Sequence, residues 1–391
     1  MTKVVSMLIL SLFISIAAAK EPIEKPHFLN YSMDDKTQRY FEKSVDALFT
    51  AIINGKISDS LLSPKMAALT FPMLQELIDY ESKNKSHNLK IQDKKLINVY
   101  PISSQSYFLT ISFNSFDAEA VPSPIYTFNL IATKTEKAFT FAIPLDYLTR
   151  HWKTETVGNV TYHFRTQLNK ERANIFNEKN SAIANKIGVK PEKFDFYMVD
   201  NYQEILNLNG FSYFRKSNGQ TRDGYGVVAN TIFSVMNNED FSHDIFHYYS
   251  RQINNRENQN RISEEGIAYL WGSAYYTDQQ GEMISYARLK LALKKYLSEN
   301  QQANLFDLFN QNNKVFDHIA PEISVRSTIS AMIANKIEKE LGVPGLLKLI
   351  NAGRKDRLNN YLRITEELIG LNKENFNLLV TEWLYESNQS Q

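Results

Sequence analysis

The chain has 391 residues and a formal net charge of +1, so it carries no strong field that would draw in nucleic acid or an anionic membrane surface. Its 43% hydrophobic and 22% charged residues are ordinary for a globular protein, and its length predicts more than one domain. It contains no cysteine, which excludes disulfides, thiolate metal ligands, a cysteine nucleophile and the lipid-bearing cysteine of a lipoprotein.

Residues 1–19 have the composition of a secretory signal peptide. Lys3 supplies the positive start, an apolar run follows, and Ala17-Ala18-Ala19 offers a cleavage site. An uncleaved membrane anchor is the alternative, but the apolar run of about 16 residues is shorter than the roughly 20 that span a bilayer. The sequence therefore predicts a periplasmic or secreted protein with no membrane span after cleavage.

A small α+β domain is predicted for residues 31–150, after a flexible, proline-bearing lead at 20–30. Two helices with apolar residues at helical spacing come first, and a charged loop separates them from alternating strands. The predicted helices are 34–54 and 64–80, the loop is 83–95, and the strands are 96–100, 107–116, 125–133 and 138–143. This element order resembles the cone-shaped folds of the nuclear transport factor 2-like group. No cluster of acids, bases or metal ligands is found here, so a structural or protein-binding role is expected.

A second domain is predicted for residues 151–388. It begins with strands and helices in alternation and ends in a purely helical part that follows Trp271. The first part is predicted as strand 158–164, helix 173–186, strand 193–199, short helix 201–206 and strand 224–229, which leads into a helix with two histidines. The predicted later helices are 284–299, 303–310, 323–341, 344–352, 361–369 and 375–385.

The histidines of that helix are His243 and His247. Residues four apart lie on one face of a helix, one turn from each other, so both imidazoles can reach the same metal ion. Glu265, on the next predicted helix, would supply a third ligand. Two imidazoles and one carboxylate with an open fourth position are typical of catalytic zinc rather than structural zinc.

The stretches H-D-I-F-H and E-E-G-I-A resemble the gluzincin metallopeptidases, whose pattern is H-E-x-x-H followed by a glutamate on the next helix. The resemblance covers roughly Gly158 to Tyr385, and the helical remainder is similar to the lower half of peptidase-MA-like domains. It implies a zinc site made of His243, His247 and Glu265, and an exported peptidase that hydrolyses peptide bonds with a zinc-activated water. It also implies that strand 225–229 lines the cleft and can pair with an extended peptide or protein substrate.

Asp244 departs from the family pattern, because the family has its general-base glutamate at this position. An aspartate side chain is one methylene shorter, so its carboxylate falls short by about 1 Å unless the helix sits closer to the metal. Three interpretations follow: a base in a re-tuned site, a partner of a metal ligand, or the remnant of a lost activity. The last makes the chain a catalytically inactive, metallopeptidase-like binding or scaffold protein of the cell envelope.

Other residues around the motif are open to more than one interpretation. Glu264 is expected to be either solvated or an acceptor for a metal ligand, because only one of two adjacent helical glutamates can face the metal. The family's oxyanion-stabilising group has several candidates: Tyr275, Tyr276, Tyr286, His318 and Arg326. A metal-free alternative has one histidine packed on the core and the other paired with a carboxylate. The signatures of serine hydrolases, phosphate-binding loops and dinucleotide-binding folds are absent from the sequence.

Overall fold

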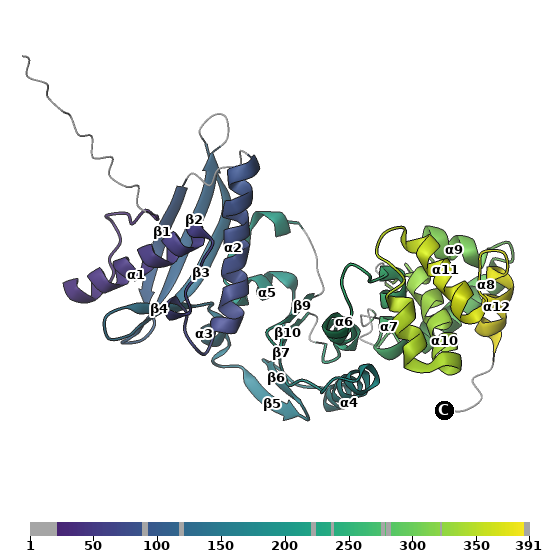
Figure 1. The fold of residues 1–391 in the computed structure, drawn as a ribbon. Helices are drawn as coiled ribbons and strands as arrows, with labels where there is room; N and C mark the ends of the chain where they lie inside the picture. Colours follow the sequence, from purple (N-terminus) through teal and green to yellow (C-terminus); the bar gives the residue numbers. More distant parts are fainter. Residues whose placement is uncertain are drawn as a thin grey trace, which may run out of the picture. The chain divides into compact units, whose positions relative to one another are not determined.

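The computed structural model describes residues 22–87, 93–116, 121–219, 224–235, 238–274, 278, 283–320 and 323–386, so the predicted signal peptide lies outside the described residues. The fold is α+β, as predicted. The chain divides into two compact units, Met1–Leu145 with Asn209–Asn218, and Asp146–Leu208 with Gly219–Gln391 (Figure 1). No helix among the described residues has the length and apolar character needed to cross a membrane.

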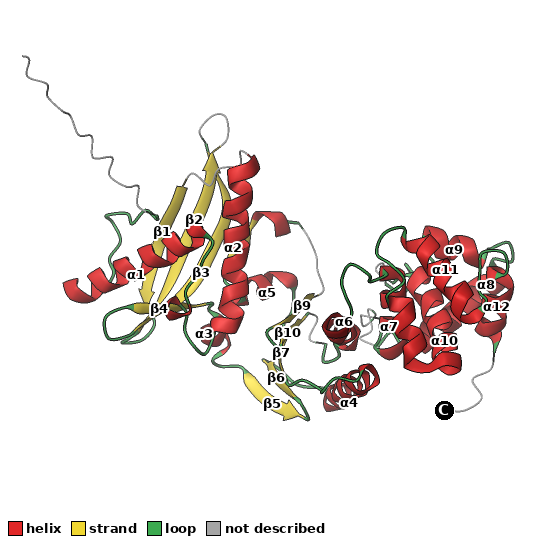
Figure 2. Ribbon diagram, in the orientation of Figure 1, coloured by secondary structure: helices red, strands yellow, loops and turns green. Residues whose placement is uncertain are grey.

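The first unit is an antiparallel sheet covered on one face by two helices (Figure 2). Phe49 of α1 contacts Phe113 in the sheet at a ring distance of 6.0 Å, and Tyr80 of α2 contacts Tyr126 at 4.9 Å. The elements are α1 (Asp35–Asn54), the short 3-10 helix η1 (Asp59–Leu61), α2 (Ala67–His87), β1 (Asp93–Pro101), β2 (Ser106–Phe116), β3 (Pro122–Lys134) and β4 (Phe139–Ala142). The four strands pair in chain order, as expected for the predicted meander.

Two features of this unit differ from the sequence prediction. Helix α2 continues to His87, although a loop was predicted from residue 83, because the polar end of this helix has no apolar periodicity. A fifth strand, β8 (Phe211–Phe214), pairs with β3 although it lies far along the chain, and no strand was predicted there. Phe211 packs on Phe128 at a ring distance of 4.8 Å, so tertiary packing stabilises this four-residue strand.

The second unit starts with a mixed sheet in the order β5-β6-β7-β10-β9. Strands β6 and β7 are parallel and are connected by α4. Its elements are α3 (Leu145–Thr149), β5 (Lys153–Val157), β6 (Val160–Phe164), α4 (Lys170–Ile187), β7 (Phe194–Met198), α5 (Tyr202–Leu208), β9 (Gly224–Val228) and β10 (Thr231–Ser234), while the 3-10 helix η2 (Arg215–Ser217) follows β8. The sequence prediction missed α3, β5 and β10.

Strand β10 corrects the expected route into the histidine helix. The predicted strand 224–229 is β9, an edge strand, and it leads first into β10 rather than directly into that helix. Ala229 and Asn230 form the turn between the two strands with φ values of 45° and 58°. A two-residue hairpin turn with both φ values positive usually contains Asn-Gly or Asp-Gly, so the Ala-Asn pair gave no turn signal.

The rest of the second unit is helical, as predicted. Helix α10 is central, and α7, α8, α9, α11 and α12 all pack against it. The bounds are α6 (Ser242–Ile253), α7 (Arg261–Trp271), α8 (Tyr286–Glu299), α9 (Leu305–Gln311), α10 (Val325–Ile350), α11 (Arg357–Ile369) and α12 (Phe376–Tyr385). Helix α10 contains a break at Gly342, with φ 65° and ψ −165°, which separates the two helical segments predicted here.

Gly266 lets α7 approach α10 closely. A Cβ atom at this position would lie 2.6 Å from the Ser330 Cβ atom and 2.8 Å from the Ser330 carbonyl carbon, both well inside van der Waals contact. The Ser330 hydroxyl donates a hydrogen bond of 2.9 Å to the carbonyl oxygen of Ile262, which joins the two helices one turn away. The glycine therefore determines where α7 lies, and with it the neighbouring Glu265.

We predict that Gly266→Ala lowers the free energy of unfolding by about 1–3 kcal/mol, because the added methyl group forces α7 and α10 apart. The measurement is urea denaturation followed by circular dichroism. Gly188→Ala is the matched control, because Gly188 has a φ of +84° and no atom lies within 4 Å of an added Cβ. This substitution should lower the free energy of unfolding by about 1 kcal/mol, through backbone strain alone. An unchanged denaturation midpoint for Gly266→Ala would contradict the close-packing argument.

Candidate metal centre

Helix α6 is held against α4, which fixes the position of its two histidines. The Oδ1 atom of Asp240 accepts a hydrogen bond of 2.9 Å from the backbone N–H of Ser242, at the first residue of the helix. Lys179 of α4 forms an ion pair of 3.0 Å with the other oxygen of Asp240. Farther along α6, the hydroxyl of Tyr249 donates to Asn180 of α4 at 2.7 Å. Polar contacts at both ends therefore hold α6 in one rotation about its axis.

Asn260 fixes the start of α7. Its Oδ1 atom accepts from the backbone N–H of Ile262 at 3.1 Å, the usual role of a helix N-cap. Its Nδ2 group donates to the carbonyl oxygens of Gly353 at 3.2 Å and Arg357 at 2.8 Å. The fully buried side chain thus ties α7 to the segment that leads into α11. An asparagine directly before a helix is a recognised start signal, so this role could have been predicted from the sequence, although it was not.

The structure brings together the three predicted ligands. The Nε2 atoms of His243 and His247 are 3.1 Å apart. Glu265 places one carboxylate oxygen 3.5 Å from Nε2 of His243 and the other 3.9 Å from Nε2 of His247. Two nitrogen ligands of a tetrahedral zinc ion lie about 3.3 Å apart, because each bond is about 2.0–2.1 Å long. The three side chains are therefore spaced so that they can hold one metal ion.

Each histidine has an acceptor at its other ring nitrogen. The Nδ1 atom of His243 donates to the carbonyl oxygen of Ser273 at 3.3 Å, and Nδ1 of His247 lies 3.2 Å from Oε1 of Glu264. Because these oxygens can only accept, the ring protons belong on Nδ1 and the lone pairs on the Nε2 atoms that face Glu265. Glu264 thus lies at ion-pair distance behind a candidate ligand, which favours the second of its two predicted roles, and a carboxylate behind a histidine is common at zinc sites.

Gly272 makes the contact between Ser273 and His243 possible. A Cβ atom on Gly272 would lie 2.8 Å from the carbonyl oxygen of Ser242 and 2.9 Å from the backbone nitrogen of His243. The chain that leaves α7 therefore passes directly against the first turn of α6, at a distance that only glycine allows.

Burial and neighbouring charge act against each other at this site. Burial is the largest single influence on His247 and opposes its protonation, but Glu264, Glu265 and Asp244 together outweigh it and raise its pKa. Burial likewise acts to raise the pKa of Glu265. When the histidines are protonated, however, the hydrogen bond from His243 and the positive charges of His247, His243 and Arg261 lower this pKa to about 2. Two Nε2 lone pairs that face each other repel, so the site favours a cation between the histidines, either a proton or a metal ion.

Asp244 lies in the same cavity as the histidines and is half-buried. Its Oδ2 atom is buried and, among the described residues, has no hydrogen-bond partner. Burial raises the pKa of this carboxyl group, while the positive charge of His243 acts in the opposite direction. An unsatisfied carboxylate oxygen of this kind can accept a proton from a bound molecule, which is the property that a general base needs.

The cavity around these groups has a volume of about 460 Å³. Besides the residues already described, Arg251, Arg261 and Tyr269 line it. The sequence analysis did not identify Tyr269, although it follows Glu265 by one helical turn and therefore lies on the same face of α7. Burial raises the pKa of Tyr269 to about 12, so its hydroxyl group is protonated at neutral pH.

None of the predicted oxyanion-stabilising candidates that the structure describes lines this cavity. Tyr275 and Tyr276 are outside the described residues. Neither Tyr286 nor His318 is among the described residues that line the cavity, and Arg326 lines a neighbouring cavity instead. Tyr286 packs against the hydrophobic core of this unit.

A comparison with protein-family models found no matching model, and a comparison with curated proteins found no matching sequence.

We expect the purified protein to bind about one zinc ion per chain. His247→Ala should abolish this binding, because the two ligands that remain, His243 and Glu265, are too few for a zinc site, which takes at least three protein ligands. Metal analysis of the dialysed protein is the measurement. His163→Ala is the matched control, since His163 pairs with Asp195 on the sheet and takes no part in the cluster. Equal zinc content in the two variants would remove His247 from the ligand set.

We expect Glu264→Gln to weaken zinc binding by about 10- to 100-fold, because the neutral amide is a poorer acceptor for the Nδ1–H group of His247. Zinc affinity would be measured by competition with a fluorescent chelator. Glu257→Gln serves as the control, since Glu257 is exposed and its carboxylate lies 3.5 Å from Arg354, outside the metal cluster. An affinity equal to that of the wild type would show that Glu264 does not support the ligand.

Proposed function

We propose that this protein is an exported zinc-dependent peptidase that hydrolyses peptide bonds. The observation that supports this most directly is the convergence of His243, His247 and Glu265, with donor distances of 3.1, 3.5 and 3.9 Å, in a polar cavity that also contains Asp244. Two imidazoles and one carboxylate are the protein ligands of many catalytic zinc sites, which keep one position open. The N-terminal composition supports export, and hence a periplasmic or secreted location.

Zinc bound by these three residues would polarise a substrate carbonyl group and lower the pKa of its bound water to about 7. The residues of the chain supply the remaining chemistry. Asp244 would accept a proton from the attacking water on its unsatisfied Oδ2 atom and pass it to the leaving amine. Its raised pKa favours this role, because a base whose pKa lies closer to neutral pH can both accept and release a proton.

A catalytically inactive binding or scaffold protein of the cell envelope is the second candidate. The observation in its favour is the aspartate at position 244, whose shorter side chain reaches about 1 Å less far than the glutamate of the gluzincin pattern. Such a protein would keep zinc and bind peptides without cleaving them.

Variants of Asp244 distinguish these functions. Asp244→Asn keeps the size of the side chain but removes the base, so it should retain zinc and lower peptide turnover by about a hundredfold or more. Asp244→Glu lowers turnover if the site is adapted to aspartate, because the extra methylene overpacks it, and raises turnover if the site has lost its activity. Turnover would be measured on a peptide library by mass spectrometry. Unchanged turnover in both variants would exclude Asp244 as the base.

A further inference from the structure

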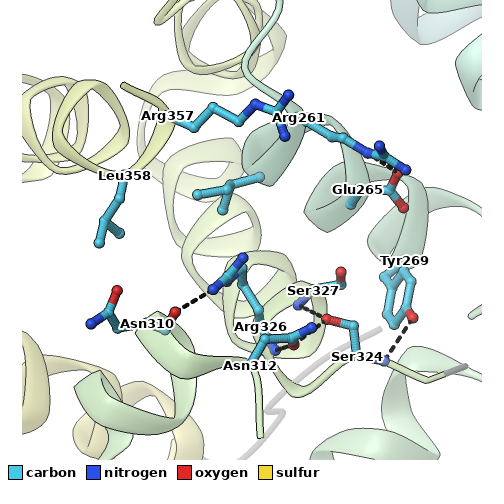
Figure 3. A pocket seen from close by; sticks show the side chains of 11 residues that line it. Arg261, Glu265, Tyr269, Asn310, Asn312, Ser324, Arg326, Ser327, Arg357 and Leu358 are labelled. Carbon is cyan, nitrogen blue, oxygen red and sulfur yellow. Dashed lines mark hydrogen bonds and ion pairs between the residues drawn. The ribbon is translucent and has the colours of Figure 1, made fainter. Parts of the chain in front are cut away.

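A second cavity of about 460 Å³ adjoins the candidate metal centre. The two cavities share Arg261, Glu265 and Tyr269, so they meet at the third metal-ligand candidate. Helix α7, the end of α9 and the starts of α10 and α11 surround the second cavity (Figure 3). A molecule bound at the metal centre can therefore extend into this space, which has the size of a small-molecule site.

Positive charge dominates the lining of this cavity. It contains three guanidinium groups, from Arg261, Arg326 and Arg357, and a single carboxylate, Glu265. Figure 3 shows Arg357 and Arg261 along one side of the opening and Arg326 along the other. Glu265 is committed to the metal centre, so the cavity has more positive charge than its own residues neutralise. The whole chain, by contrast, has a net charge of only +1.

Two backbone carbonyl groups hold Arg326 in place. Its Nε group donates to the carbonyl oxygen of Phe309 at 2.7 Å, and a terminal nitrogen donates to the carbonyl oxygen of Asn310. The side chain is half-buried, and no described carboxylate lies within ion-pair distance of it. A partly buried cation without a counter-ion is unfavourable unless a ligand supplies the negative charge. Two backbone contacts fix the guanidinium group, while its remaining N–H groups are available to such a ligand.

We propose that this cavity binds the C-terminal carboxylate of a peptide substrate, with Arg326 as the main contact and Arg357 as a second cation. The inference rests on the proposed peptidase function and makes it specific for bonds close to a free carboxyl end. Guanidinium groups suit carboxylates because they donate two parallel hydrogen bonds. The amide groups of Asn310 and Asn312 also line the cavity, and amide N–H groups can donate to a peptide carbonyl group beside the carboxylate.

The test compares two forms of one fluorescein-labelled hexapeptide library, with a free C-terminal carboxylate or a C-terminal amide. Binding is measured by fluorescence anisotropy to zinc-loaded Asp244→Asn protein, and cleavage by mass spectrometry with the zinc-loaded wild type. We expect the free acids to bind at least about tenfold more tightly than the amides, the usual effect of one charge-assisted hydrogen bond. Cleavage should fall within the last few residues of the peptide.

Arginine variants test which side chains provide this preference. Arg326→Gln should reduce the ratio of amide to acid dissociation constants to about one, and Arg326→Lys should leave an intermediate ratio, since lysine keeps the charge but loses the paired donors. Arg357→Gln should lower the ratio without disturbing the fold, because Arg357 is exposed. Arg363→Gln is the matched control on α11, since Arg363 pairs with Glu367 and does not line the cavity.

The outcomes separate this inference from the proposed function. If both library forms bind with equal affinity and both are cleaved, the peptidase assignment stands and the carboxylate site is overturned. Tight, Arg326-dependent binding of free acids without cleavage would keep the site and overturn the peptidase. Tighter binding of inorganic phosphate than of the free acids, or full recovery of affinity by an amidated library with an internal aspartate, would also overturn the assignment to a C-terminal carboxylate.

Discussion

The two imidazole Nε2 atoms that face each other at 3.1 Å are the feature on which the rest of the site depends. Both rings use Nδ1 for a hydrogen bond or an ion pair, so both present a lone pair to the same small volume. Asp244, Glu264 and Glu265 add three carboxyl groups around this pair. Such a concentration of lone pairs and negative charge is stable only with a cation at its centre, because buried charge needs a partner of opposite sign.

Precise placement of α6 and α7 is what brings these groups together. The two helices come from different parts of the second unit, since α6 packs on α4 beside the sheet and α7 packs on α10 in the helical part. Gly266 and Gly272 permit the close approaches, and Asn260 secures the start of α7. These residues contact neither a metal nor a substrate directly, yet they determine the distances between the ligands. Among the described residues, the site itself contains the buried Oδ2 atom of Asp244, which has no hydrogen-bond partner.

The first unit has a different character. Its helices and sheet are joined by aromatic contacts such as those of Phe113 and Tyr126, and its described residues contribute no member to the metal cluster. Strand β8 completes its sheet although the neighbouring segments of the chain belong to the second unit. The chain therefore passes between the units more than once, and a cut near residue 145 would remove one strand from the first unit. The resemblance of this unit to the nuclear transport factor 2-like group stays a prediction.

The sequence alone determined the elements with a strong local signal. Apolar spacing predicted most helices and the strands β1 to β4 of the first sheet, and Gly342 marked the break in α10. The spacing of His243 and His247 placed two imidazoles on one helix face. Short strands such as β8 and β10 escaped prediction, because four residues carry little periodic signal and their stability comes from partners distant in the sequence. Only the tertiary structure decided that Glu264 supports His247, that Tyr269 lines the cavity and that Arg326 belongs to a neighbouring one. Those roles depend on distances between helices, and local sequence does not encode how closely two helices pack until both surfaces are known.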